Sequence, residues 1–278
     1  MRTRRLLLAL PAVALATLLP ACTSTSSASD AEPSEEPTIV AAADPSLLPY
    51  NFLAEDGKTW EGLNVELATL LSEELGETIV FEAAGFDSII PGLTSGRYDV
   101  ALTGMFDTKE RQKTVDFVDY LLAKNDFLVR GDHREVASMD DLCGEVVGIP
   151  GGALEADLLA EASAACEAAG DPAITVKEFA DLDATILALT SGRIDVAPND
   201  SAANAYVVAS NPADLKATGA YLAEGYFAAG FAKESELTER FEAAVAAIIE
   251  SGAYGELLEE WGIADRAMDA PIINGSPF

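Results

Sequence analysis

The sequence predicts an α/β protein whose folded body consists of two lobes of similar construction. Residues 93–101 read LTSGRYDVA and residues 189–197 read LTSGRIDVA, a near-identical repeat at an offset of 96 positions. Segments typical of strands alternate with segments of helical periodicity throughout, the pattern of an α/β fold with parallel sheets. About 240 residues follow a polar N-terminal stretch, which is enough for two lobes of ordinary domain size.

Each copy of the repeat predicts the same unit of structure. An apolar helical pattern precedes it, a glycine marks the end of the helix, and a strand follows. Asp99 and Asp195 occupy the same place in the two copies. We therefore expect both to be structural residues that fix the turn.

The remaining elements follow from periodicity. Leu63, Leu67, Leu70 and Leu71 recur at helical spacing after the first strand, and residues 241–249 and 254–261 do so near the end. The candidate strands are residues 39–43, 78–82, 98–102, 146–149, 174–179, 194–197 and 226–232.

In parallel sheets, ligands bind beyond the carboxyl ends of the strands. The repeat strands deliver residues 102–104 and 198–200 to those ends, so the sequence predicts a site between the lobes. Gly104 and Asp200 stand at equivalent positions. Glycine lets the backbone approach a ligand closely, and the aspartate supplies a negative charge.

The N-terminus indicates export. Three arginines within the first five residues precede an apolar stretch at 6–19, which is shorter than the roughly 20 residues that span a bilayer. This arrangement is typical of a secretory signal peptide over residues 1–21. The segment ending at Cys22 resembles a bacterial lipobox, whose cysteine carries the lipid anchor. The alternative is an ordinary signal peptide followed by an incidental cysteine.

Composition limits the possible functions. Residues 22–37 are rich in Ser, Glu and Pro and predict a flexible tether that holds the body outside the cytoplasm, at the cell membrane. The formal charge is −30, and removal of residues 1–21 takes away three arginines and no acids. Such an acidic chain argues against nucleic-acid binding, which needs a basic surface.

Two cysteines remain in the body, Cys143 and Cys166. An even pair in an oxidising compartment predicts a disulfide. Two cysteines and the distant His133 do not form a zinc site, so we expect no metal, and no cofactor motif is recognisable.

The chain resembles the family 3 extracellular solute-binding proteins, the amino-acid-binding components of ABC transporters. The resemblance runs over residues 38–263. Residues 104–120 (GMFDTKERQKTVDFVDY) carry it most specifically, because they are close to the family signature Gly-Met-x-x-Thr-x-Glu-Arg-x-x-x-Val-Asp-Phe. The other matching segments are residues 39–52, 60–75, 86–96, 144–152 and 192–203.

The resemblance implies a periplasmic-binding-protein clamshell with mostly parallel sheets, in which two lobes close on a two-strand hinge. Residues 38–121 and 228–278 would form lobe 1, and residues 122–227 would form lobe 2. The hinge crossings would fall at 120–124 and 226–230, and the C-terminal helices would return to lobe 1.

The resemblance also implies a ligand site. Arg111 would hold the α-carboxylate of an amino acid, because a planar guanidinium binds a carboxylate bidentately. Asp200 would meet the α-ammonium group. Without the motif, Arg111 reads as a surface arginine. The full set of expected contacts is Arg111, Asp200, Asp44, Phe86, Gly104, Phe106, Thr103, Gly152, Ala153 and Asn199.

Several of these residues have alternative roles or depart from the family pattern. Phe86 would pack on the ligand side chain or simply belong to the core, and Asp44 would read that side chain or cap a turn. Phe106 stands where Ser or Thr is usual, Ala153 where Thr is common, and Pro150 where a polar residue is common. These changes predict a more apolar pocket, and the sequence does not identify the ligand.

The expected partners are a small ligand, an ABC permease and the membrane, reached through the lipid, and the expected state is a monomer. A sensor lipoprotein that signals to a membrane partner would carry the same pocket. A dehydratase-like enzyme on this fold is a further alternative. The residues supply little catalytic chemistry, because His133 has no nucleophile suggested by a motif and Ser201 lacks a Gly-x-Ser-x-Gly setting.

Overall fold

The computed structural model describes residues 37–221 and 225–278. The predicted signal peptide at 1–21, Cys22 and nearly all of the tether at 22–37 lie outside these residues. Residues 36–278 form one compact unit. Among the described residues, no helix combines the length and the apolar character needed to cross a bilayer.

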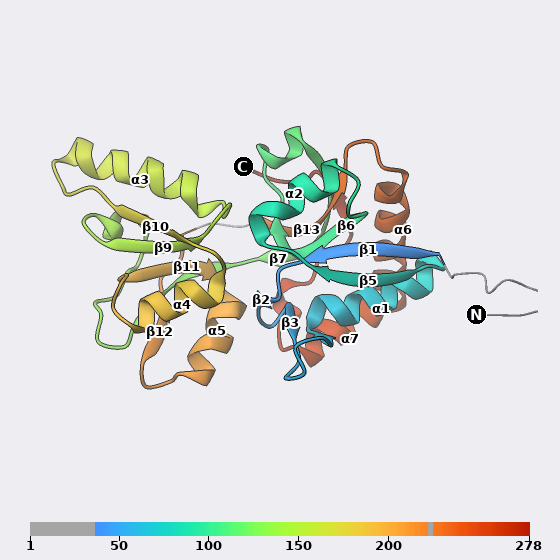
Figure 1. The fold of residues 1–278 in the computed structure, drawn as a ribbon, viewed down its shortest axis with the longest axis horizontal. Coiled ribbons are helices and arrows are strands. Elements are labelled where there is room, and N and C mark those ends of the chain that lie inside the picture. The colour runs from blue at the N-terminus through green and yellow to red at the C-terminus, as the bar shows by residue number, and fades with distance from the viewer. Residues whose placement is uncertain (1–36, 222–224) are drawn as a thin grey trace, which may run out of the picture. The chain divides into compact units, whose positions relative to one another are not determined.

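Two main sheets organise the body and confirm the two-lobed α/β prediction (Figure 1). The first lobe contains a six-stranded sheet in the order β14 (Ile272–Ile273), β7 (Val115–Ala123), β13 (Gly225–Ala232), β6 (Val100–Phe106), β1 (Thr38–Ala43) and β5 (Thr78–Ala83). The second lobe contains a five-stranded sheet in the order β10 (Thr175–Phe179), β9 (Val146–Pro150), β11 (Val196–Asp200), β8 (Asn125–Arg130) and β12 (Leu215–Thr218).

Parallel pairing occupies only part of each sheet. Strands β5, β1 and β6 pair in parallel, as do β10, β9 and β11. The other pairings, which involve β7, β8, β12, β13 and β14, are antiparallel. The antiparallel share exceeds the sequence prediction because these strands include those that carry the chain to and from the other lobe.

Helices cover both faces of each sheet. In the first lobe, α1 (Leu63–Leu75), α6 (Glu236–Ser251) and α7 (Ala253–Glu260) share one apolar core, and α2 (Phe86–Thr94) covers the opposite face. In the second lobe, α3 (Glu155–Ala169) packs on one face. Helices α4 (Leu182–Thr190) and α5 (Ser201–Ser210) pack on the other. The C-terminal helices thus return to the first lobe, as expected.

Short elements complete the chain. Strands β2 (Ser46–Leu47), β3 (Asn51–Leu53) and β4 (Trp60–Glu61) form a small antiparallel sheet. Three 3-10 turns, η1 (Arg111–Lys113), η2 (Met139–Leu142) and η3 (Ala264–Arg266), lie in connecting segments.

The sequence repeat forms the predicted unit in both lobes. Gly96 and Gly192 follow α2 and α4 with φ values of 71° and 72°, which glycine adopts most easily. Asp99 accepts a bond from the backbone N–H of Val40 on the neighbouring strand. Asp195 accepts one from Val146 in the same way, so both aspartates are structural as predicted, but they bond the neighbouring strand instead of fixing the turn.

The chain passes between the sheets twice. The first passage is at residue 124, between β7 and β8, inside the expected range of 120–124. Gly225, the first described residue after Tyr221, already pairs with Ala123, so the chain is back in the first sheet at this point. The expected crossing at 226–230 is therefore wrong, because those residues lie within β13. The residue boundaries of the two lobes stay a prediction.

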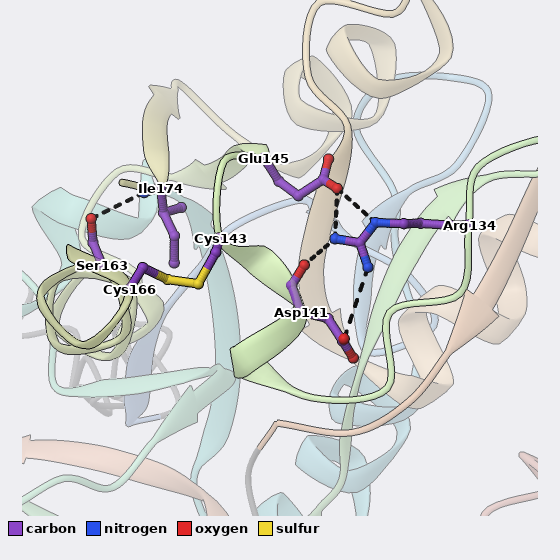
Figure 2. Close-up of a disulfide and its surroundings, with 7 residues drawn as sticks. All are labelled: Arg134, Asp141, Cys143, Glu145, Ser163, Cys166 and Ile174. Atoms are coloured by element: carbon purple, nitrogen blue, oxygen red, sulfur yellow. Dashed lines mark hydrogen bonds and ion pairs between the residues drawn. A yellow bond between two sulfur atoms is a disulfide. The ribbon is translucent and has the colours of Figure 1, made fainter. Parts of the chain in front are cut away.

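A disulfide joins Cys143 to Cys166, as the sequence predicts. It ties the segment before β9 to helix α3 (Figure 2). Beside it, Ser163 on α3 accepts a bond of 3.1 Å from the N–H of Ile174, which precedes β10. The disulfide and this bond hold α3 near its sheet, and Arg134 pairs with Glu145 at 2.7 Å in the same region.

Candidate ligand-binding site

A cavity of about 70 Å³ lies between the carboxyl-terminal ends of β6 in the first lobe and β9 and β11 in the second. Both lobes contribute to it, as the repeat predicts. Its lining is mainly apolar, with one arginine and three carboxylates. The lining residues are Asp44, Ser46, Leu47, Phe86, Gly104, Phe106, Arg111, Pro150, Ala153, Leu154, Glu155, Leu182, Pro198, Asn199, Asp200 and Phe227.

Arg111 begins the short 3-10 turn after β6 and is held by backbone acceptors. Its Nη1 donates to the Phe106 carbonyl at 2.8 Å, and its Nη2 donates across the lobes to the Gly152 carbonyl at 3.0 Å. The guanidinium lies 5.4 Å from the ring centroid of Phe86, a cation–π arrangement. Arg111 is therefore a fixed cation in the cavity wall, not a free surface arginine.

The charge of Arg111 persists at neutral pH. Burial lowers the pKa of its guanidinium to about 10, and the negative charges of Glu155, Asp107 and Asp157 oppose that shift. No carboxylate of the described residues forms an ion pair with Arg111 within 4.0 Å. The guanidinium can therefore receive an anionic group of a ligand.

Aromatic rings form the apolar part of the cavity. Phe106 meets Phe227 edge to face, with ring centroids 5.0 Å apart. Phe227 meets Tyr50 in the same way at 5.1 Å. Phe86, at the first position of α2, contributes both to the cavity and to the apolar cluster under that helix. The predicted apolar character of the pocket follows from these rings.

Gly104 forms part of the cavity floor with φ at 62°. A Cβ atom there would stand 2.7 Å from Leu47 and 3.3 Å from the Phe227 ring. Only glycine fits both the backbone conformation and the space. The structure thus gives a packing reason for the glycine that the repeat singled out.

Asp44 directly follows β1 and lines the cavity. Its Oδ1 accepts bonds from the Ser46 N–H at 2.9 Å and the Ser46 hydroxyl at 2.7 Å, so it also fixes a turn. Thr103 lies behind it, fully buried, and accepts a bond of 2.8 Å from the Asp44 N–H. Burial raises the pKa of Asp44, the Ser46 bonds lower it, and nearby Asp181 raises it further.

Asp200 lies at the end of β11 and is 2 % exposed. It caps α5, and its carboxylate forms an ion pair with Arg266 at 2.6 Å. The hydroxyl of Tyr50 donates to the same carboxylate at 2.9 Å. Arg266 and Tyr50 come from the first lobe, so this buried group of charges joins the two lobes. The sequence did not predict this partnership.

Glu155 is a further buried carboxyl group in the cavity wall that the sequence analysis missed. It is 8 % exposed and stands at the first position of α3. The hydroxyl of Tyr221 donates to its Oε1 at 2.6 Å. Burial raises the pKa of Glu155, while Tyr221 and the charge of Arg111 lower it. The Gly151–Gly152 turn just before α3 was the signal that could have located it.

The predicted contacts divide into three groups. Eight of the ten line the cavity: Arg111, Asp200, Asp44, Phe86, Gly104, Phe106, Ala153 and Asn199. Thr103 supports Asp44 from behind, and Gly152 acts through its carbonyl on Arg111. The sequence did not predict a role in the site for residues in segments without a motif. These are Leu154, Leu182 and Phe227, which line the cavity, and Arg266, which binds Asp200.

One group of side chains outside the cavity has ligand types that metals prefer. His133, Glu145 and Asp195 present atoms within 4.8 Å of one another. Arg134 pairs with Glu145 at 2.7 Å, and Arg130 pairs with Asp195 at 3.3 Å. Since both carboxylates already face arginines, this group is explained as an internal ion-pair network.

Comparisons with known proteins identify relatives that are named as arginine-binding proteins. The chain is 27% identical to the arginine-binding protein ArgT of Corynebacterium glutamicum, over 86% of this chain and 79% of that protein. It is 28% identical to the arginine-binding extracellular protein ArtP of Bacillus subtilis, over 95% of this chain and all of that protein.

Solved structures of amino-acid-binding proteins are also similar to this chain. An ancestral arginine-binding protein bound to arginine superposes with a TM-score of 0.74 at 30% identity, covering 81% of this chain and 97% of that one. An amino-acid ABC transporter substrate-binding protein from Streptococcus pneumoniae, bound to L-arginine, gives 0.72 at 26% identity, covering 83% and 97%. The sequence profile of one family matches residues 39–264. The chain therefore belongs to the bacterial extracellular solute-binding proteins, family 3.

Proposed function

We propose that this protein captures a free amino acid in the cavity between its lobes, with L-arginine as the first candidate. The observation that carries the proposal is Arg111. It is a fixed guanidinium with no ion-pair partner among the described residues, in a wall to which both lobes contribute. Such a group binds a carboxylate bidentately.

Acidic side chains near the cavity favour a basic ligand side chain. Asp44 lines the cavity, and the charges of Asp181 and Asp183 lie close enough to influence it. A cationic side chain would relieve the mutual repulsion of these carboxylates. The similar proteins named above as arginine-binding support the same choice.

Two further parts of the proposal concern location and delivery. The chain passes its ligand to an ABC importer, and Cys22 carries a lipid that holds the protein at the outer face of the cell membrane. The signal-peptide pattern and the tether support this, and both belong to the segment outside the described residues. Mass spectrometry of the protein purified from cells would detect the added lipid on Cys22.

A thermal-shift panel tests the ligand class. The purified protein is screened against the twenty amino acids and agmatine, which is arginine without its carboxylate. A ligand at 100 times its Kd adds about 2.7 kcal/mol to the free energy of unfolding. We expect a shift with arginine and none with agmatine. If no amino acid raises the melting temperature, the proposal is wrong.

We further propose that binding occurs without chemical conversion. One similar structure is an ancestral amino-acid-binding protein described as a precursor of cyclohexadienyl dehydratase, at 25% identity and a TM-score of 0.71. Arginine recovered from the complex after long incubation should be unchanged in mass. A new product would show that the protein is an enzyme.

A further inference from the structure

The carboxylate of Asp200 is already fully engaged by the protein. Its Oδ1 accepts bonds from the Tyr50 hydroxyl at 2.9 Å and from the backbone N–H groups of Ala202 and Ala203 at 2.9 and 3.2 Å. Its Oδ2 receives Nη1 of Arg266 at 2.6 Å. Four donors therefore surround one carboxylate.

Arg266 is an internal partner for Asp200. It is 4 % exposed, and its other contacts are the Tyr50 hydroxyl at 2.9 Å and the Ser201 hydroxyl at 2.6 Å. A ligand ammonium brought to Asp200 would meet a carboxylate that is already neutralised and would face the like charge of Arg266. Like charges at short range in a buried site repel strongly.

Unlike Asp200, Glu155 has no cationic partner among the described residues. It lines the same cavity, and the one hydrogen bond to it from another side chain comes from Tyr221, among the described residues. No ion pair within 4.0 Å involves Glu155 in the described part of the chain. A buried carboxylate without a paired cation is costly, and a ligand cation would remove that cost.

Glu155 also stands near the cation that we assign to the ligand carboxylate. The charges of Glu155 and Arg111 influence each other, and Arg111 donates to the carbonyl of Gly152, three residues before Glu155. An α-amino acid carries its carboxylate and its ammonium on one carbon. A neighbouring guanidinium and carboxylate match that arrangement.

We propose that Glu155, rather than Asp200, binds the α-ammonium group of the ligand, while Asp200 stays paired with Arg266. This inference rests on the proposed amino-acid function. It makes Glu155 a specificity-determining residue, and it makes the Asp200–Arg266 pair a structural joint between the lobes.

The test compares two probes that differ only in the ammonium group, L-arginine and 5-guanidinopentanoic acid, by titration calorimetry. Glu155→Gln should weaken L-arginine binding by roughly 30-fold or more, the equivalent of about 2 kcal/mol for a charge-assisted bond. It should change binding of the deaminated acid by less than about 3-fold, since uncharged partners contribute little selectivity. Glu161→Gln, an exposed change on the same helix, should alter neither.

The outcomes separate the two proposals. Equal losses for both probes in Glu155→Gln, or a selective loss of arginine in Asp200→Asn alone, would overturn the role of Glu155 and leave the proposed function standing. If the wild-type protein binds no amino acid, both proposals are wrong. If arginine is not the ligand, the best amino acid of the panel and its deaminated analogue take its place. Should Glu155→Gln not fold, Glu155→Asp must show the same selective loss.

Discussion

At the scale of single residues, the proposed carboxylate site depends on the orientation of Arg111. The carbonyls of Phe106 and Gly152 hold two of its nitrogens, and the ring of Phe86 lies over the guanidinium. The guanidinium therefore needs little reorganisation when a ligand binds, so less side-chain entropy is lost on binding.

Arg111→Lys keeps the positive charge but loses the planar fork and the contact with Phe86. We expect the Kd for the bound amino acid to rise by roughly 100-fold, because a point charge cannot replace two parallel hydrogen bonds. Titration calorimetry measures the change. Arg193→Lys, at an exposed position, is the matched control and should bind like the wild type. Equal affinity in Arg111→Lys would remove Arg111 from the site.

A second residue-scale prediction concerns Asp119, which is fully buried on β7. Burial and the neighbouring Asp107 raise the pKa of Asp119 to about 8, although the N–H of Gly275 donates to it. Gln112 and the N–H of Ser276 hold Asp107 in place. Asp119 is therefore protonated in the folded protein at neutral pH.

The sign of its effect on stability follows from proton binding. Between about pH 4 and pH 8 the folded state keeps the proton on Asp119 and the unfolded state releases it, so stability falls as the pH rises. Asp119→Asn should remove this fall, and its free energy of unfolding should exceed that of the wild type increasingly towards pH 8. Urea denaturation at several pH values measures it. Asp269→Asn, at an exposed site, should follow the wild type, and parallel curves for Asp119→Asn would contradict the assignment.

Sequence reasoning located the residues that belong to a motif. Arg111 lies in the signature segment, and Gly104 and Asp200 follow from the repeat. Arg266 could not be found in this way, because it pairs with Asp200 across 66 residues and lies in the short turn η3, which carries no motif. Glu155 was missed because one glutamate at a helix start resembles any other before its burial is known.

At the scale of elements, the repeat was the most informative feature. It predicted both helix–turn–strand units and the equivalent ends of β6 and β11. Strands β7, β8 and β12 are absent from the predicted set, and β12 is short, with only the four residues Leu215–Thr218. The antiparallel strands were underestimated, since pairing direction depends on where the chain re-enters a sheet and not on local pattern.

The disulfide gives an element-scale prediction. It closes a loop of 23 residues between the segment before β9 and helix α3. The double change Cys143→Ala and Cys166→Ala should lower the free energy of unfolding by about 2–4 kcal/mol, because the unfolded chain is then less constrained. Urea denaturation measures it, and the wild type with a reductant should match the double variant. An unchanged midpoint in both would show that the bridge does not contribute.

At the scale of the whole molecule, contacts between the lobes gather around the cavity. Arg111 reaches the Gly152 carbonyl, and the Ser46 hydroxyl accepts the N–H of Leu182 at 3.4 Å. The ion pair of Asp200 and Arg266 is a buried charged contact between the lobes. A ligand that touches both lobes would add to these contacts and shift the population towards closure.

Arg266→Met tests the charged joint. It leaves the Asp200 carboxylate buried without its cation, which should lower the free energy of unfolding by about 3–5 kcal/mol. Asp200→Asn introduced in the same chain should restore a large part of that loss, because the uncompensated charge is gone. Urea denaturation of the two single variants and the double variant measures the coupling. Simple addition of the two losses would show that the pair does not act as a unit.

The most direct test of amino-acid capture between the lobes is titration calorimetry of the purified wild-type protein with L-arginine. We predict one site per chain and an affinity lost in Arg111→Lys. If neither L-arginine nor any other amino acid produces saturable heat, the cavity does not serve a free amino acid, and the proposed function is wrong.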